Sequence, residues 1–125
     1  MAIVNAQLKN TQLNIFDPST PGNGVPGGRR YAITNIMVCN TYDPNASDAD
    51  LREASFDMHI KKAGQPLNNK VTCVVREMPL PAGETFTLDS EKIILDEGEE
   101  VSFVAQPDIG DGLTDLAVSV SYLEV

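Results

Sequence analysis

Apolar and polar residues alternate with a period of two along most of this chain. The alternation is clearest in residues 56–61, 84–89, 101–103 and 116–122, where apolar and polar side chains take turns. This period is typical of strands with one face on a core and the other in solvent, because successive side chains of a strand point to opposite faces. The four segments therefore predict β-strands.

Two other segments, residues 31–39 and 71–75, are apolar at nearly every position. Such runs predict central strands, or strands with one face in an interface with another chain. Shorter strands are expected at residues 2–8, 12–16 and 93–95, so the chain should hold eight or nine strands.

Glycine and proline mark the connections between these segments. Residues 17–30 hold seven of the seventeen Gly and Pro residues and predict a mobile loop. The sequence Asp96-Glu97-Gly98-Glu99 predicts a hairpin after residues 93–95, with glycine at a position of positive φ. In residues 47–53 we expect one or two helical turns, because Ser47 and Asp50 have the spacing of a capping box.

Many short strands with almost no helix predict an all-β fold. We expect one domain over residues 1–125, an antiparallel β-sandwich that is jelly-roll-like and has about eight strands. An immunoglobulin-like sandwich is the rival, but the chain lacks the tryptophan that such a domain usually buries.

The charge is strongly acidic and unevenly distributed. Nine basic and eighteen acidic residues give a net charge of −9; residues 1–76 carry +2 and residues 77–125 carry −11. Phosphate binding needs clustered basic side chains, so we expect no nucleic-acid partner. No apolar run approaches the roughly 20 residues that span a bilayer, and the first residues do not resemble a secretory signal. We therefore expect no membrane partner and a chain that is made in the cytosol.

Side chains with catalytic potential are few. The single histidine, His59, lies in an alternating strand and is expected on its solvated face. Cys39 and Cys73 lie in apolar runs, which predicts small buried side chains whose thiols react only after denaturation. Their strands could be neighbours, but the sequence does not define the spacing that a disulfide needs.

Acidic residues gather in three places without forming a recognised site. The oxygen-rich residues 43–50 lack the glycine and glutamate of an EF-hand, although a calcium site of another kind there, or at Asp108 and Asp111, is a minor alternative. The carboxylates at positions 89, 91, 96, 97, 99 and 100 predict a solvated acidic rim rather than a glycosidase pair. We predict no catalytic residues, no metal and no cofactor: the chain is not an enzyme.

The order of the motifs resembles that of a known group of proteins. The chain contains, in this order, RRYAITNIMVCNT, FDMHIKKAGQPLNNK, PLPAGETFTLD, ILDEGEEVSFVA and LAVSVSYLEV. This succession, over residues 25–125, resembles small β-sandwich virion structural proteins of tailed bacteriophages, including marine and cyanobacterial phages. Residues 43–53 form a longer connection than the turn expected there.

The resemblance implies a non-enzymatic component of the virion, which is assembled in the host cytoplasm, and many such sandwiches act as trimers. We expect a capsid decoration (cement) protein, a homotrimer that stabilises the head by binding between capsomers. A tail fibre, baseplate or adaptor component is the alternative, and a glycan-binding module for the host surface is the second. The protein partner would be the major capsid protein or a tail protein of the same phage.

Four residues are candidates for partner binding. Arg29 and Arg30 end the Gly/Pro-rich loop and could pair with carboxylates of a partner. Ile36 and Val38 belong to the apolar run at residues 31–39, which could face an oligomer contact. The N-terminal segment, residues 1–30, could act as an attachment arm; equally, its first strand could pair within the sandwich.

Overall fold

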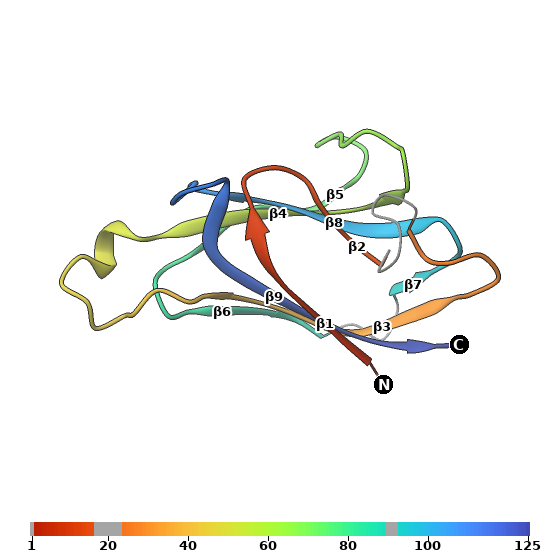
Figure 1. Ribbon diagram of the computed structural model, residues 1–125, viewed down its shortest axis with the longest axis horizontal. Coiled ribbons are helices and arrows are strands. Elements are labelled where there is room, and N and C mark those ends of the chain that lie inside the picture. The colour runs from red at the N-terminus through yellow and green to blue at the C-terminus, as the bar shows by residue number, and fades with distance from the viewer. Residues whose placement is uncertain (1, 17–23, 90–92) are drawn as a thin grey trace.

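The computed structural model describes residues 2–16, 24–89 and 93–125, which form two antiparallel sheets packed face to face (Figure 1). One turn of 3-10 helix, η1 (Ala49–Leu51), lies within the predicted helical stretch. The strands of the described residues are β1 (Ala2–Lys9), β2 (Leu13–Ile15), β3 (Tyr31–Asn40), β4 (Ala54–Lys62), β5 (Cys73–Leu80), β6 (Thr85–Leu88), β7 (Ile93–Leu95), β8 (Glu99–Gln106) and β9 (Leu113–Glu124).

The strand order is that of a jelly roll. The five-stranded sheet has the order β1-β9-β3-β6, with β7 also paired to β3, and the four-stranded sheet has the order β2-β8-β4-β5. β6 and β7 pair with successive parts of β3, so together they fill one strand position. The predicted all-β, jelly-roll-like sandwich is confirmed.

The core lies between the sheets and takes alternate residues from each strand. Leu8, Phe56, Phe103 and Val118 are among its fully enclosed side chains. Burying a side chain of this kind contributes about 1.5–3 kcal/mol, because apolar surface leaves water. The period of two in the sequence thus becomes one buried face per sheet.

The apolar run at residues 71–75 is not a central strand. β5 begins at Cys73 and forms an edge of the four-stranded sheet. Val71 and Val74 remain 69% and 52% exposed. The edge position explains how the strand accommodates Pro79, which has no N–H for a second neighbour.

The predicted hairpin around Gly98 is also wrong. β7 pairs in the five-stranded sheet and β8 in the four-stranded sheet, so the intervening turn is a corner between the sheets. Gly98 does have the expected positive φ, at 78°. The local signal therefore identified the turn, but the pairing of the two strands is set by their distant neighbours.

Much of the predicted N-terminal arm belongs to the sandwich. β1 and β2 pair with β9 and β8. Val25 is 2% exposed, and its N–H donates to the carbonyl of Glu99 over 2.9 Å. At Gly24 a Cβ would lie 2.6 Å from the carbonyl carbon of Gly98, so the backbones are in close contact. Residues 2–16 and 24–30 are thus no free arm; residues 17–23 lie outside the described residues.

Candidate assembly surface

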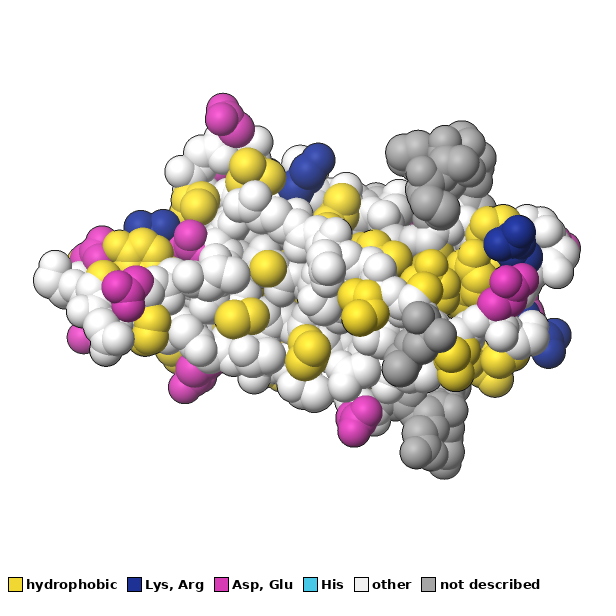
Figure 2. All heavy atoms as spheres, turned by 60° about the horizontal axis from the view of Figure 1, so that its bottom comes forward, with side chains coloured by type: hydrophobic (Ala, Val, Ile, Leu, Met, Phe, Trp, Pro, Cys, Tyr) yellow, Lys and Arg dark blue, Asp and Glu magenta, His cyan; other side chains and the backbone are white. Residues whose placement is uncertain are grey.

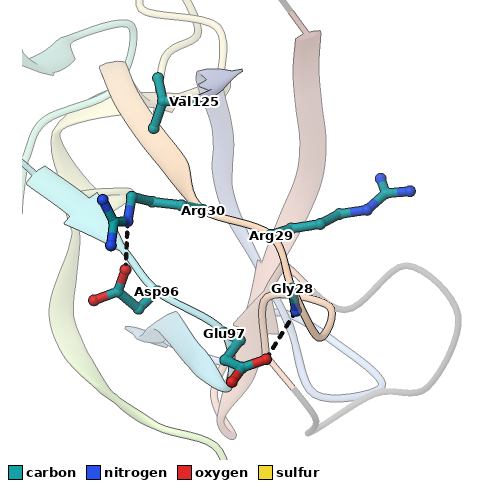
Figure 3. Close-up of a pocket in the computed structure, with 6 residues that line it drawn as sticks. All are labelled: Gly28, Arg29, Arg30, Asp96, Glu97 and Val125. Carbon is teal, nitrogen blue, oxygen red and sulfur yellow. Dashed lines mark hydrogen bonds and ion pairs between the residues drawn. The ribbon is translucent and has the colours of Figure 1, made fainter.

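Arg29 and Arg30 lie beside a hollow at one end of the molecule (Figure 3). The hollow has a volume of about 420 Å³ and is lined by Gly28, Arg29, Arg30, Asp96, Glu97 and Val125. Arg30 Nε lies 2.6 Å from Asp96 Oδ1, and Arg29 Nε lies 3.8 Å from Glu124 Oε1. Each arginine is more than half exposed, so these ion pairs contribute little and can exchange with a partner's carboxylates.

Ile36 and Val38 are not available to a partner. Both side chains are fully buried between the sheets, at 0% exposure. Met37, between them in the sequence, is 42% exposed because it points to the opposite face of β3. The predicted partner-binding role of Ile36 and Val38 is therefore wrong, and the accessible part of this strand is its other side.

That other side belongs to a broad surface without charged side chains, which we call the uncharged face. It is the middle of the outer face of the five-stranded sheet, seen in Figure 2, where charged side chains lie toward the ends and margins. Lys9 on β1 and Asp115 on β9 follow the same alternation but lie beyond its end. Its members, placed by strand register and alternation, are Ile3, Asn5, Gln7, Ala32, Asn35, Met37, Cys39, Thr85, Thr87, Ile94, Ala117, Ser119, Ser121 and Leu123.

The uncharged face has a polar middle and an apolar end. In the middle, the Ser119 hydroxyl donates to Asn5 Oδ1 over 2.7 Å. At one end, Leu123, Ala32 and Ile94 lie in one row across three strands. Ile94 and Leu123 are 53% and 41% exposed. This apolar row lies on strands that lead to the end where Arg29 and Arg30 are placed.

The outer face of the four-stranded sheet is different, because charged groups are buried there. Lys61 Nζ lies 2.5 Å from Glu100 Oε1, and the two side chains are 1% and 0% exposed. Within the described residues, Glu100 Oε2 has no hydrogen-bond partner. Glu100 is thus not part of the solvated acidic rim that the sequence predicted; Glu91 of that rim lies outside the described residues.

His59 is likewise buried rather than solvated. Its side chain is 1% exposed, and Nδ1 lies 2.8 Å from Thr72 Oγ1. Thr72 in turn donates to the carbonyl of Asn68, so the chain between β4 and β5 is held against the sheet. Burial lowers the pKa of His59, because the charged imidazolium loses its hydration.

The cysteines are free and lie on different sheets. Cys39 is on β3 and Cys73 on β5, and both are partly exposed rather than fully buried. Burial raises the pKa of the Cys73 thiol, since a thiolate would lose hydration there. The expected full burial of the two cysteines is therefore wrong.

The candidate calcium loops use their carboxylates to form turns. Asp43 Oδ1 accepts the N–H of Asn45, and Asp108 Oδ1 accepts the N–H groups of Gly110 and Gly112. Among residues 2–16, 24–89 and 93–125, no three histidine, cysteine or acidic side chains lie together as a metal site would require. In the same part of the chain, no helix is long and apolar enough to cross a membrane.

No protein-family model matches this chain, and no curated protein matches it either.

Proposed function

We propose that this chain is a non-enzymatic structural protein of a tailed-bacteriophage virion, a capsid decoration protein that binds between capsomers. The observation that carries the proposal is the uncharged face on a chain whose net charge is −9. The resemblance of the motif order to small virion proteins supplies the biological setting.

The uncharged face is suited to contact with another protein. Dehydrating a charged group costs several kcal/mol unless it finds a partner, and the cores of protein interfaces are accordingly depleted of charge. A sheet face of Ser, Thr, Asn and Ala side chains with exposed Met37 and Ile94 loses its water at a lower cost than a charged face would, provided that its polar groups find hydrogen-bond partners. Such a face matches a capsid surface that is itself flat and weakly charged.

Charge placed on this face should abolish attachment while the fold remains. The test compares Met37→Glu with Val74→Glu, because both residues are exposed apolar residues on strands, at 42% and 52%, but on different sheets. We expect M37E to lose binding to particles that lack the protein, and V74E to bind as the wild type does. Equal melting temperatures of the two variants would show that binding alone has changed.

The number of copies per particle distinguishes a decoration protein on the head from a component of the tail. Densitometry of purified particles should give hundreds of copies per particle for a decoration protein, and a dozen or fewer for a fibre, baseplate or adaptor component. Binding of M37E at wild-type affinity would contradict attachment through the uncharged face. Saturable binding of a host glycan in solution, without particle binding, would favour the glycan-binding alternative instead.

A further inference from the structure

The sandwich has four sheet edges, and three of them are unsuited to pairing with another strand. β2 has three residues, and the edge made by β6 and β7 consists of strands of four and three residues. β5 is longer, but its register against β4 shifts twice. It also contains Pro79 and a left-handed Glu77 with φ of 46°. Short strands, prolines and bulges are the devices that protect sheet edges from other chains.

β1 has none of these protections over most of its length. It has eight residues without proline, glycine or an acidic group, and Ala2–Gln7 pair with β9 without a register shift. Among the described residues, β9 is the only strand that pairs with it (Figure 1). Its second edge therefore presents backbone N–H and C=O groups that another strand can bind.

An apolar opening lies next to this edge. It has a volume of about 160 Å³, and its lining includes Val4, Ala6, Leu13, Phe16 and Tyr122. Tyr122 and Phe16 pack edge to face, with ring centroids 4.9 Å apart. Val4 and Ala6 point to the core side of β1 but are only partly buried. A strand added to β1 would place side chains over this opening.

The charge distribution favours a second copy of this chain as the added strand. Residues 2–16 contain one basic residue, Lys9, and no acidic residue, although the whole chain has a net charge of −9. Two copies that meet along β1 therefore bring no carboxylates of these residues together, and the neighbouring uncharged face adds none. Contacts between more acidic parts of the two chains would be repulsive.

We propose that β1 pairs antiparallel with β1 of a second copy, which joins the two five-stranded sheets into one continuous sheet. A register centred on Asn5 places Asn5 opposite Asn5, Val4 opposite Ala6, and Ile3 opposite Gln7. This register keeps Val4 and Ala6 on the core side, where each copy covers the other's apolar opening. The contact is twofold and self-complementary, so it gives a dimer rather than the trimer expected from the resemblance.

The test measures the oligomeric state of the isolated protein, residues 1–125, and of variants that carry a charge at position 5, the centre of the proposed contact. Sedimentation equilibrium from about 1 µM to about 1 mM should show a dimer for the wild type. Asn5→Lys and Asn5→Glu each place like charges opposite each other, and should raise the dimer Kd by up to about fivefold. An equimolar mixture of N5K and N5E should dimerise again, because the facing charges are then opposite.

A control separates the edge from the neighbouring face. Thr87→Lys puts the same charge on the uncharged face but on β6, at the other side of the sheet, and should leave the dimer unchanged. A monomeric or trimeric wild type would overturn the proposal, and so would a dimer that N5K and N5E do not weaken. Because no particles are needed, these results are independent of the proposed virion role.

Discussion

The outer faces of the two sheets of this sandwich differ in charge and in exposure to solvent. The five-stranded sheet leaves the middle of its outer face uncovered and without charged side chains, and charged residues such as Lys9 and Asp115 lie toward the ends of its strands. The four-stranded sheet carries Lys61, Glu100 and His59 on its outer side, and all three are at most 5% exposed. Polar residues alternate with apolar ones in both sheets, so the pattern alone does not distinguish them.

The difference shows what a covering segment does to a polar face. Residues 63–72 connect β4 and β5, and Thr72 at their end bonds to His59. Covered charges must find partners, which Lys61 and Glu100 do by pairing directly. An uncovered face can remain in water without any such pair. We infer that the covered face serves stability and the uncovered face serves contact with other molecules.

The largest effect should come from breaking the covered ion pair. Glu100→Gln leaves the Lys61 ammonium buried without its counter-charge, so we expect a loss of about 3–5 kcal/mol in the free energy of unfolding. Urea denaturation measures this loss. The double variant K61M/E100L removes both charges and should recover most of it, because well-packed apolar side chains often replace a buried ion pair without cost.

The uncovered face supplies the matched control for this prediction. Asn5 and Ser119 also form a cross-strand pair, but in solvent. Replacing both by alanine should change the free energy of unfolding by no more than about 0.5 kcal/mol. A small loss in E100Q, similar to that of N5A/S119A, would show that the covered pair is hydrated and that the two faces do not differ as described.

A smaller effect is expected from the titration of His59. Because burial lowers its pKa in the folded protein, the unfolded chain binds the proton more readily. The stability from this group is complete above about pH 6.5, the ordinary value. It is lost as the pH falls from there through the lower pKa of the folded state. Urea midpoints between about pH 8 and about pH 5 should show this loss, and H59Q should lack it.

The chain has one histidine, so its titration can also be observed directly. The proton resonances of the imidazole should titrate with a midpoint below the ordinary pKa of about 6.5. A wild-type midpoint at or above that value would contradict the burial of His59.

The smallest expected difference concerns the two cysteines. Burial raises the pKa of the Cys73 thiol, so little thiolate is present near neutral pH, whereas Cys39 lies on the uncovered face. We expect native Cys39 to react with a maleimide a few times faster than native Cys73. C39S and C73S variants allow each rate to be measured alone. If the proposed attachment through the uncharged face is correct, binding to particles should protect Cys39 and leave Cys73 reactive.

The periodic part of the fold could be predicted from the sequence. Alternation at residues 116–122 and 56–61 predicted the centres of β9 and β4, and short strands between turns predicted the sandwich. This worked because the side chains of a strand alternate in direction whatever lies around it. The positive φ of Gly98 was likewise predictable, because a turn depends on neighbouring residues.

The roles of the two sides of a strand were decided by the tertiary structure. In the apolar run of β3, no local signal indicates that Ile36 and Val38 enter the core while Met37 faces out. The burial of His59 and Glu100 depends on residues distant in sequence, Thr72 and Lys61 respectively. Val25 enters the core from a Gly/Pro-rich loop because its backbone bonds to Glu99 on a distant strand. A period of two specifies that successive side chains oppose each other, but which side is covered follows only from long-range packing.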